Sequence, residues 1–428
     1  MAFDPESLES HLPLRREGGS GSARWTSARA AVGSIPDGAR VYVGGGAGPP
    51  MALLQAMVAE RARWSHLELA MPMLQRRLPV FEHAGEPFHF VTLQASPAFK
   101  YLWGHDAMRV LPTRYSDYAR LCAPDGPLPC DAALVAVSPP HDGRVSLGLS
   151  VGSTVVPART APLVLAQVNA EIPYTLGAGE LPVDHFDALV EGDEEIVDAR
   201  ARSATDPVSD RIAALAAALV PDGGTIQFGI GSIPDAILGG LRDRRGLRVH
   251  SGLVSEACVD LYEAGVVDAP MVAAEVVSSP RMRRWVHLNP ALLMAPPSVT
   301  HGAAILAGIE RFVALNSAVE VALDGSANSE VAGGQIVSGP GGAPDFAFGA
   351  SVSNGGRFVA ALKSTASGGS VSRIVRHIEP PDPTTLPAYL ADVVVTEHGR
   401  AEVRPLAGRE RADAIRLLAH PDHRAALA

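Results

Sequence analysis

The 428-residue chain has few cysteines and no long apolar run. Both features narrow the classes of protein to which it can belong. Its three cysteines, Cys122, Cys130 and Cys258, are odd in number and fit no metal-ligand spacing, which favours reduced thiols in a cytoplasmic protein. No stretch of about 18 apolar residues occurs, so no membrane span is predicted. The amino terminus, MAFDPESLESHLPLRREGG, has acidic residues and no apolar core of signal-peptide length, so we do not expect a secretion signal.

Blocks of positive charge are also absent. The 36 Lys and Arg residues stand against 46 Asp and Glu, for a net charge of −10, and a nucleic-acid partner is therefore not predicted. An anion can still bind locally, at backbone N–H groups. The scattered histidines His301, His377 and His398 follow no metal-ligand spacing, so no metal site is predicted.

A glycine corner stands at the centre of the sequence, in PDGGTIQFGIGSIPDAILGGL (221–241). Residues 225–228 are a short β-prone run, Gly229 and Gly231 remove side chains where the chain turns, and Pro234 suits the first turn of a helix. Such a corner offers backbone N–H groups to an anion or to a developing oxyanion. A tight strand-to-helix turn without a ligand has the same pattern.

The corner has a counterpart early in the chain. Residues 36–54, PDGARVYVGGGAGPPMALL, repeat the stretch with an offset of 185 residues: Gly44 and Gly46 match Gly229 and Gly231, and Leu53 matches Leu238. The repeat predicts two related α/β halves, with a cleft between them that receives one corner from each side and suits a small molecule.

The rest of the chain alternates apolar strands with helical stretches, which predicts an α/β fold with two mainly parallel sheets. We expect an N-terminal extension (1–25) with a helix and a flexible REGGSGS segment, then a first domain (26–200) and a second (201–428), divided in the polar stretch 193–210. The expected strands are 41–44, 67–70, 88–92, 133–137, 164–168, 225–228, 272–276 and 312–314. The expected helices are 51–64, 211–219, 255–265 and 412–427, the last broken at His420-Pro421, with glycine-rich loops over 333–356.

Several long segments resemble the acetyl-CoA hydrolase/transferase family, over about residues 30–427. They are IPDGARVYVGGGAGPP, SPPHDGRVSLGLS, QVNAEIPYTLG, PDGGTIQFGIGSIPDAIL, NSAVEV, GPGGAPDFAFGASVSNGG, STASGGSVSRIV, VVVTEHG and AHPDHR. The resemblance implies two α/β domains, coenzyme A as the carrier of the acyl substrate, and a homodimer or larger homo-oligomer. It also implies a covalent route, in which a glutamate attacks acyl-CoA and becomes a glutamyl-CoA thioester.

In the family that glutamate follows a His-Ser or Tyr-Thr pair, in patterns such as H-S-E-M-x-S-D-x-x-x-D-L. The matching run here is HSGLVSEACVDL, which places Gly252 at the position of the nucleophile after His250 and Ser251. Glu256, four residues on, is the nearest acid, and on a helix it would lie about 6 Å further along. After NSAVEV the family's D-L-x-G-Q also changes, to A-L-D-G-S (322–326).

These departures leave three functions open. The favoured one is direct attack by water or another acceptor on a bound acyl-CoA, which makes the protein a hydrolase or an acyltransferase with no glutamyl-CoA intermediate. A catalytically silent CoA or acyl-CoA binder is the second, and a CoA-transferase that uses Glu256 is the third. His250 is the obvious partner base, although it and Ser251 are family positions.

The resemblance also predicts which residues bind CoA and the acyl group. The predicted CoA contacts lie in two glycine-rich loops: Gly229, Ile230, Gly231, Ser232 and Ile233, then Gly341, Gly342, Asp345, Gly349, Ser353, Asn354 and Gly355. The predicted acyl-side residues are Gly45, Gly46, Gly48 and Asn169. Lys363, Arg373 and Arg376 are candidates for phosphate contacts.

Overall fold

The structure is a computed structural model that describes residues 14, 24–92, 94–199 and 206–428. It divides into two compact units: unit 1 comprises Met1–Ala199 and Val272–Val299, and unit 2 comprises Arg200–Met271 and Thr300–Ala428. The change of unit near residue 200 falls in the polar stretch singled out in the sequence, whereas residues 272–299, assigned there to the second domain, cluster with unit 1. The helix and flexible segment expected in residues 1–25 fall outside the described residues.

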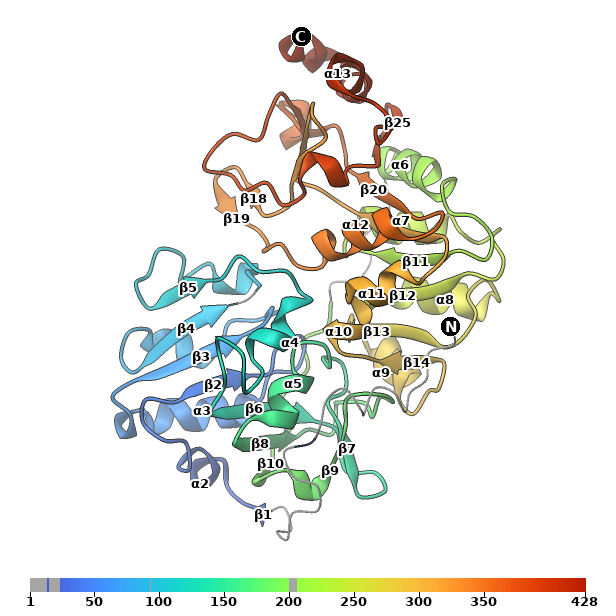
Figure 1. The fold of residues 1–428 in the computed structure, drawn as a ribbon. Helices are drawn as coiled ribbons and strands as arrows, with labels where there is room; N and C mark the ends of the chain where they lie inside the picture. The colour runs from blue at the N-terminus through green and yellow to red at the C-terminus, as the bar shows by residue number, and fades with distance from the viewer. Residues whose placement is uncertain (1–13, 15–23, 93, 200–205) are drawn as a thin grey trace. The chain divides into compact units, whose positions relative to one another are not determined.

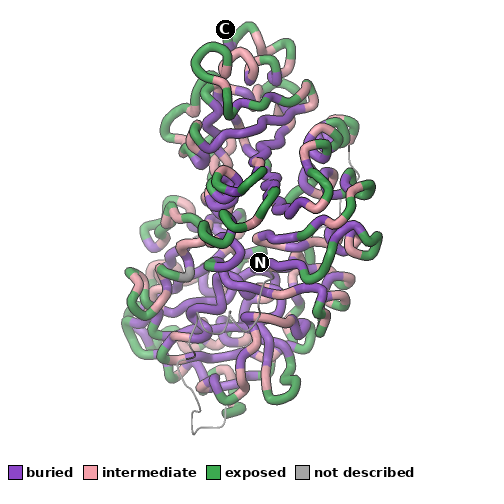
Figure 2. The backbone as a smooth tube through the Cα atoms, turned by 45° about the vertical axis from the view of Figure 1, so that its right-hand side comes forward, coloured by how far each residue is buried: buried purple, intermediate pink, exposed green. Residues whose placement is uncertain are grey.

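Unit 1 is built on an eight-stranded sheet in which every pairing is parallel. The six inner strands are apolar and buried over most of their length, as expected of strands covered on both faces, whereas the two edge strands are mostly exposed. Figure 2 shows the backbone coloured by this burial. In sheet order they are β1 (Arg24–Trp25), β10 (Ala188–Glu191), β8 (Leu163–Val168), β6 (Ala132–Val137), β2 (Arg40–Val43), β3 (Leu67–Met71), β4 (Phe88–Thr92) and β5 (Met108–Val110).

Short helices and loops complete unit 1. Its main core gathers side chains from the sheet and from the helices after β1 and β2, with Leu53 and Leu54 fully buried. The helices are α2 (Ala28–Val32), α3 (Met51–Ala59), α4 (Asp117–Leu121), α5 (Val155–Thr160) and α9 (Pro280–Val286), and the remaining strands are β7 (Arg144–Ser146), β9 (Glu180–Pro182), β13 (Met271–Val276) and β14 (Leu292–Met294).

Unit 2 is also built on a mainly parallel sheet, with one antiparallel pairing at the β25 edge. Its strands, in sheet order, are β12 (Arg248–Val254), β11 (Thr225–Phe228), β15 (Phe312–Asn316), β20 (Arg357–Ala361), β24 (Val393–Thr396) and β25 (Gly399–Glu402). Among them, β11, β12, β20 and β25 are labelled in Figure 1. The two sheets together give the α/β architecture with two mainly parallel sheets that the sequence predicts.

The helices of unit 2 form two packed groups. In one, α6 packs on α7 and α7 on α8; in the other, α11 packs on α12, and α12 lies against β15 and β20. The helices are α6 (Pro207–Ala217), α7 (Ser232–Gly239), α8 (Glu256–Glu263), α11 (Ala303–Ala307), α12 (Ala343–Val352) and α13 (Gly408–Arg416). The short helix α10 (Pro297–Thr300) contains the residues at which the chain passes from unit 1 to unit 2. A small sheet of β16 (Glu320–Ala322), β17 (Ala327–Asn328) and β23 (Ile374–Val375) and two short hairpins, β18 (Val331–Ala332) with β19 (Gln335–Ile336) and β21 (Thr365–Ala366) with β22 (Val371–Ser372), lie between the larger elements.

The internal repeat is visible in the topology of both units. The order β3-β2-β6-β8-β10 in unit 1 matches β12-β11-β15-β20-β24 in unit 2, and each glycine corner follows the strand at which the order reverses. Gly46 and Gly231, matched in the repeat, both have positive φ, +69° and +122°. In open α/β sheets, this switch point at the carboxyl ends of the strands is where ligands bind.

Three expected elements differ from the structure. The loop expected over 333–356 contains α12, which begins after Gly342 with a proline in its first turn and buries Phe346, so packing overrides its poor helix-forming composition. The helix expected over 51–64 ends at Ala59 and continues as a short 3₁₀ turn. The C-terminal helix begins earlier, at Gly408, and the predicted break at His420-Pro421 is present.

Gly177 provides a stability test of the unit 1 loops. Its φ is +112°, and a Cβ there would lie 2.4 Å from the carbonyl oxygen of Met294, a backbone atom held in β14. We expect Gly177→Ala to destabilise the protein by about 3 kcal/mol in urea unfolding, from overpacking and backbone strain together. Gly143→Ala is the control, since φ is +74° with no atom within 4 Å, and it is expected to cost only the strain, about 1–2 kcal/mol. Equal losses in the two variants would contradict the steric explanation.

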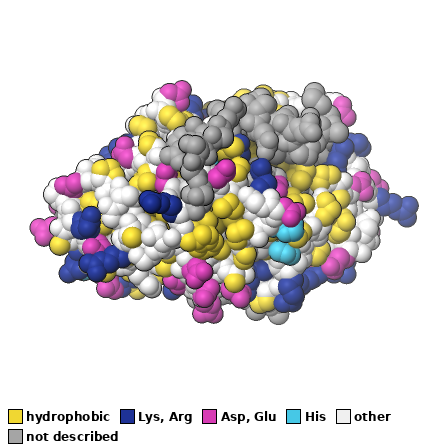
Figure 3. Space-filling view, turned by 90° about the horizontal axis from the view of Figure 1, so that it is seen from below, with side chains coloured by type: hydrophobic (Ala, Val, Ile, Leu, Met, Phe, Trp, Pro, Cys, Tyr) yellow, Lys and Arg dark blue, Asp and Glu magenta, His cyan; other side chains and the backbone are white. Residues whose placement is uncertain are grey.

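The distribution of surface charge and the composition of the helices are relevant to nucleic-acid and membrane partners. On the face shown in Figure 3, acidic and basic side chains are intermixed and not gathered by sign. Among the described residues, none of the helices combines the length and the apolar composition needed to cross a bilayer.

Candidate functional site

The second glycine corner lies in a row of residues at the carboxyl ends of three neighbouring strands. Phe228 pairs with Leu315, so Gly229 lies beside Asn316, and the N–H of Gly229 donates to the carbonyl oxygen of Leu315 at 2.9 Å. The register of β11 with β12 pairs Ile226 with Val249; continued along both strands, it brings Gly252 level with Gly229. The row Gly252–Gly229–Asn316 therefore lies at the switch point of the sheet.

The corner itself exposes backbone. Gly231 has a φ of +122° that strongly favours glycine, and it is the N-cap of α7 without a capping side chain. Ile230 between the two glycines is 60% exposed, an unusual position for an isoleucine, whereas Ile233 is buried in the first turn of α7. The N–H groups of this first turn, which starts at Ser232, suit an anion or an oxyanion.

Two buried side-chain amides hydrogen-bond to each other beside the row and hold it in place. Asn316 Nδ2 donates to Gln227 Oε1 at 2.8 Å, and Gln227 Nε2 donates back to Asn316 Oδ1 at 3.4 Å. Because each amide satisfies the other, this pair fixes the ends of β11 and β15 relative to each other.

His250 and Ser251, predicted beside the nucleophile position, are both buried in β12. Ser251 is fully buried, and its hydroxyl donates to the carbonyl oxygen of Phe228 at 3.4 Å. His250 Nε2 hydrogen-bonds with the carbonyl oxygen of Thr300 at 3.2 Å. These contacts give both side chains a role in holding the row in place.

The imidazole of His301 lies where a side chain at residue 252 would point. A Cβ on Gly252 would be 3.1 Å from both Cε1 and Nε2 of His301, and one on Gly342 would be 2.4 Å from Nε2. The ring packs on Phe346 with centroids 4.3 Å apart, and its Nδ1 is 2.8 Å from the hydroxyl oxygen of Thr300. His301, interpreted from the sequence as a scattered histidine, therefore lies in the candidate site.

Burial makes the His301 imidazole harder to protonate than an exposed histidine. Desolvation, with a smaller contribution from the nearby His250, holds the pKa of the His301 imidazole well below its ordinary value. The ring is therefore neutral at physiological pH.

Glu256 lies farther from Gly252 than the sequence suggests. β12 continues to Val254, Ser255 is the N-cap, and Glu256 is the first residue of α8. The expectation of one helical turn is wrong, because an extended strand advances about 3.3 Å per residue and separates the two positions by roughly 10 Å or more.

The residues of the second predicted CoA loop lie in two separate parts of the structure. Gly341 and Gly342 precede α12, with Gly342 beside His301, and Asp345 is buried in its first turn. Gly349 has a packing role, since a Cβ there would lie 2.6 Å from Cβ of Leu306 in α11.

Ser353, Asn354 and Gly355 lie after α12, at the amino ends of the strands and away from the row. The Ser353 hydroxyl donates to the carbonyl oxygen of Ile309 at 2.5 Å, and the Asn354 carbonyl oxygen accepts from the N–H of Arg311 at 2.8 Å. Gly355 has a φ of +71° beside Arg311. These three residues close the turn between α12 and β20.

Other predicted polar residues have protein partners in the structure. Lys363 Nζ forms an ion pair with Asp206 at 2.8 Å, and this pair, with hydrogen bonds from Ser209, lowers the pKa of Asp206. Arg376 Nε donates to the carbonyl oxygen of Ala426 at 3.2 Å. Asp324, in the segment that differs from D-L-x-G-Q, accepts from the N–H of Ser326 at 2.8 Å in a local turn.

The first glycine corner, in unit 1, is packed more tightly than the second. A Cβ on Gly45 would lie 2.5 Å from Cγ of Pro72, and one on Gly48 would lie 2.9 Å from Cδ1 of Ile196. A Cβ on Gly46 would lie 2.5 Å from the hydroxyl oxygen of Ser150. Each of these glycines thus permits a close approach by a neighbouring segment of unit 1.

Asn169, the fourth predicted acyl-side residue, is buried and holds a loop. Its Nδ2 donates to the carbonyl oxygen of Glu194 at 2.7 Å, and its Oδ1 accepts from the N–H of Glu171 at 2.8 Å. The side chain therefore has structural partners on both sides of the amide.

A carboxyl group that the sequence did not indicate lies at the first corner. Glu275 in β13 accepts hydrogen bonds from the hydroxyls of Tyr115, at 2.7 Å, and Ser150. Burial raises the pKa of Glu275 to about 7, although these bonds and one from the N–H of Ser153 favour the ionised form. A Cβ on Gly152 would lie 3.0 Å from Oε1 of Glu275, so glycine is needed there.

His301 and Glu275 share the reason they were missed. Each comes near a glycine of a candidate site through tertiary contacts between segments far apart in the chain, His301 near Gly252 and Glu275 near Gly46. The sequence contains only an indirect signal for these two residues. A glycine at an expected functional position indicates that a neighbouring side chain fills the space.

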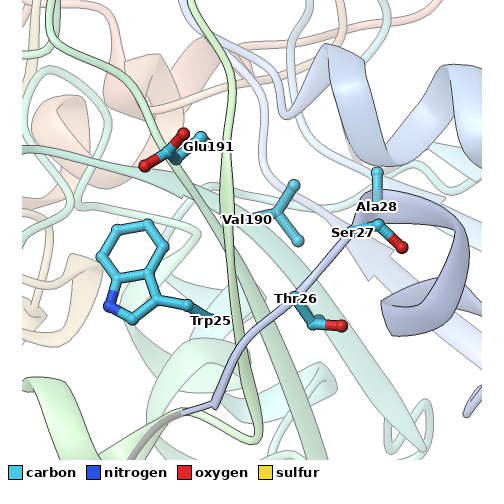
Figure 4. A pocket seen from close by; sticks show the side chains of 6 residues that line it. All are labelled: Trp25, Thr26, Ser27, Ala28, Val190 and Glu191. Carbon is cyan, nitrogen blue, oxygen red and sulfur yellow. The ribbon is translucent and has the colours of Figure 1, made fainter.

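A hollow elsewhere in unit 1 is unrelated to either corner. Figure 4 shows its lining, which comes from β1, the start of α2 and β10: Trp25, Thr26, Ser27, Ala28, Val190 and Glu191. Glu191 is its one ionisable side chain. Over the described residues, three or more His, Cys, Asp or Glu side chains do not come together as metal ligands would.

Known proteins resemble the chain over nearly its whole length. Residues 279–428 match the acetyl-CoA hydrolase/transferase C-terminal domain. The chain is 31% identical to the 4-hydroxybutyrate coenzyme A transferase of Clostridium kluyveri, covering 94% of this chain and 95% of that protein. It is 27% identical to the acetyl-CoA hydrolase of Eremothecium gossypii, over 90% and 77% of the two chains.

The solved structures support the same relationship as the sequence comparisons. The fold superimposes on RipA from Yersinia pestis with a TM-score of 0.85, at 27% identity and with 99% of this chain and 98% of that chain covered. Sequence similarity and fold thus point to the same group of proteins, and the chain belongs to the acetyl-CoA hydrolase/transferase family.

Proposed function

We propose that the protein transfers the acyl group of a CoA thioester directly to water or another acceptor, without a glutamyl-CoA intermediate. The observation that carries this proposal is the pairing of Gly252 with His301, since the position matched to the family's glutamate has no carboxylate and an imidazole fills the direction of its side chain. Ser251 offers no replacement nucleophile, because its hydroxyl is buried and bonded to a backbone carbonyl.

The corner supplies the electrostatic part of the reaction. Attack on a thioester places negative charge on the carbonyl oxygen, and N–H groups fixed by a strand-to-helix turn stabilise that charge without reorganising. Water as the acceptor gives an acyl-CoA hydrolase; an amine or alcohol gives an acyltransferase.

CoA thioesters are the proposed substrates because the relatives include both CoA transferases and acetyl-CoA hydrolases. The segments Gly229–Ile233 and Gly341–Gly342 are the proposed CoA contacts, since both adjoin the row formed by Gly252, Gly229 and Asn316. A homodimer or larger homo-oligomer in the cytoplasm remains our prediction from the family resemblance.

The two other functions have less support. A transferase that uses Glu256 would have to bring this residue to the acyl carbon from the far side of the β12–α8 junction. A silent CoA binder would bind CoA at the same loops, and the measurement of CoA release separates it from an enzyme.

Mass spectrometry with an acyl-CoA panel tests the proposal. The purified protein is incubated with acetyl-, butyryl- and 4-hydroxybutyryl-CoA, free CoA is followed, and the intact protein mass is recorded during turnover. We expect CoA release without a CoA adduct on the protein, and the same result in Glu256→Gln.

Two results would contradict the proposal. A CoA adduct mapped to Glu256, with activity lost in Glu256→Gln, would restore a covalent transferase. CoA binding without release, for every acyl group and with water, hydroxylamine or acetate as acceptor, would favour the silent binder.

A further inference from the structure

A carboxyl group lies beside the first glycine corner of unit 1 and has no part in the reaction as described so far. Glu275 accepts hydrogen bonds from the hydroxyl of Tyr115, at 2.7 Å, and from the hydroxyl of Ser150. A Cβ on Gly46 would lie 3.8 Å from its Oε2. The corner follows β2 at the switch point of the sheet, where ligands bind in open α/β folds, and its glycines are predicted to face the acyl group. Glu275 is therefore beside the predicted acyl position.

Glu275 and Ser150 form the outer end of a buried polar network. Both residues are half-buried, whereas Tyr42 and Ser153, whose hydroxyls are 3.2 Å apart, are buried. The N–H of Ser153 also donates to the Glu275 carboxyl group. Described residues thus supply three of the roughly four hydrogen bonds that a carboxylate can accept, which leaves capacity for an O–H or N–H group of a ligand.

Burial strengthens this carboxylate as a base. It raises the pKa of Glu275 to about 7, so the ionised form holds a proton more tightly than an exposed glutamate does. The hydrogen bonds from Ser150, Tyr115 and Ser153 act in the opposite direction and keep the ionised form within reach near neutral pH. A base of this strength is half ionised where a general base is most effective.

The groups that face Glu275 are uncharged. The titratable side chains that interact with it are Tyr115 and Tyr42, and burial raises the pKa of both phenols well above their ordinary value, so both are neutral. Arg114 and Asp117, beside Tyr115 in the chain, form an ion pair with each other at 3.2 Å. The first corner and the loop after β7 carry no titratable side chain where they pack on Glu275.

We propose that Glu275 is the general base of the acyl transfer and takes the proton of an uncharged acceptor that carries an O–H or N–H group. The inference rests on the proposed function, because it assigns the residue that activates the acceptor when no glutamate attacks the thioester. Ser150 and Tyr115 are positioning residues, since each hydroxyl holds one carboxylate oxygen. A negative carboxylate repels a second one, so water, an alcohol or an amine is the acceptor class and a carboxylate such as acetate is not.

The step balances without any further reactant. The acceptor gives its proton to a carboxylate oxygen of Glu275 as its lone pair forms a bond to the carbonyl carbon, and the carbonyl electron pair moves to oxygen. When the C=O bond re-forms, the C–S bond breaks and the thiolate of CoA leaves with the electron pair. The protonated Glu275 then gives its proton to the thiolate, which restores the carboxylate.

Glu275→Gln tests the proposal in the full-length protein, with acyl-CoA and water or hydroxylamine as acceptor. We expect kcat at pH 8 to fall by about 100- to 10,000-fold, while the Kd for CoA measured by calorimetry stays within about twofold. In the native protein kcat/KM should rise with pH and level off above about pH 7, because the base must be ionised, and the residual activity of the variant should lack this rise. The urea midpoint of the variant at pH 8 should be no lower than that of the native protein, so that unfolding does not account for the loss.

Two variants that keep the carboxyl group give an independent readout. Ser150→Ala and Tyr115→Phe each remove a hydrogen bond that favours the ionised form of Glu275, so the midpoint of the kcat/KM profile should move to higher pH by about one unit in each. This shift tests the proposal even if Glu275→Gln does not fold. Glu180→Gln is the control, because Glu180 is another carboxylate of unit 1 that accepts from a tyrosine, Tyr174, at 2.9 Å, and it should leave the rate and the profile unchanged.

The outcomes distinguish the base from the proposed function. Full activity in Glu275→Gln, or an unchanged midpoint in both Ser150→Ala and Tyr115→Phe, overturns the base and leaves direct acyl transfer standing if the native protein releases CoA. Reduced activity in Glu275→Gln with the rise near pH 7 retained assigns Glu275 to packing and also overturns the base. A CoA adduct on Glu256 or on Glu275 itself, CoA release that requires acetate, or no release at all overturns direct transfer and the base with it.

Discussion

Gly252→Glu is expected to destabilise the protein by about 1–3 kcal/mol, and His301→Asn is expected to recover most of that loss in the double variant. The reason is steric, because a Cβ at 252 would lie 3.1 Å from two atoms of a buried ring that Thr300 and Phe346 hold in place. Asparagine is shorter than histidine and frees the space into which the glutamate would extend. The two substitutions should therefore be strongly non-additive in urea unfolding.

The same pair of substitutions has a chemical readout. In the double variant a carboxylate occupies residue 252, which the sequence resemblance predicts to be the position of the family's nucleophile, and we expect a glutamyl-CoA adduct after incubation with acyl-CoA, detected by mass spectrometry. In Gly252→Glu alone the adduct should be much weaker, since His301 opposes the productive orientation.

Gly239→Glu is the control for the substitution itself. Gly239 is exposed at the end of α7 with no atom within 4 Å of its Cβ position, so a glutamate there should cost little or nothing. If Gly252→Glu were as stable as the native protein, or if its cost were unchanged by His301→Asn, the interpretation of Gly252 and His301 as a matched pair would be wrong.

The contact between Gly252 and His301 also shows which features the sequence could not predict. The two corners and their strands were predictable because their signals are local: an apolar run, glycines at the turn and a proline at the helix start. β4 lies at the predicted residues, and β11 ends where Gly229 begins. The repeat predicted two related halves, whereas the strand order and the register of β11 with β12 and β15 come from the structure alone.

Tertiary contacts were not predictable in this way. Residues 252 and 301 are far apart in the sequence, and no spacing rule links them; only the tertiary structure of unit 2 brings the His301 ring to the glycine. The distance from Gly252 to Glu256 was wrong for a related reason, because the sequence does not show where β12 ends and α8 begins. Helix α12 was missed since its glycines and its proline read locally as a loop.

Glu275 gives the second large prediction, a pH-dependent loss of stability that Glu275→Gln removes. Burial raises the pKa of Glu275 to about 7 in the native state, against 4.5 for an ordinary glutamate in the unfolded chain. Below pH 4.5 both states bind the proton and this group costs nothing. Between pH 4.5 and 7 the native state holds the proton that the unfolded state has lost, so the free energy of unfolding falls as the pH rises.

The magnitude follows from the two pKa values. Above pH 7, where both states are ionised, the cost reaches about 3 kcal/mol. Glutamine has the same shape and no charge, and its amide oxygen can still accept one of the hydroxyl hydrogen bonds. The difference in unfolding free energy between Glu275→Gln and the native protein should therefore move in favour of the variant by about 2.5 kcal/mol between pH 5, where part of the cost is already present, and pH 8.

Urea unfolding at pH 5, 6, 7 and 8 measures this difference, with Glu310→Gln as the control at an exposed carboxylate. A difference that does not change with pH would mean that the Glu275 carboxyl is ionised in the native state across this range. Its hydrogen bonds from Tyr115 and Ser150 would then outweigh its burial, and the carboxyl beside the first glycine corner would be a permanent negative charge. The pH at which the two curves diverge thus determines whether Glu275 can hold or release a proton near neutrality.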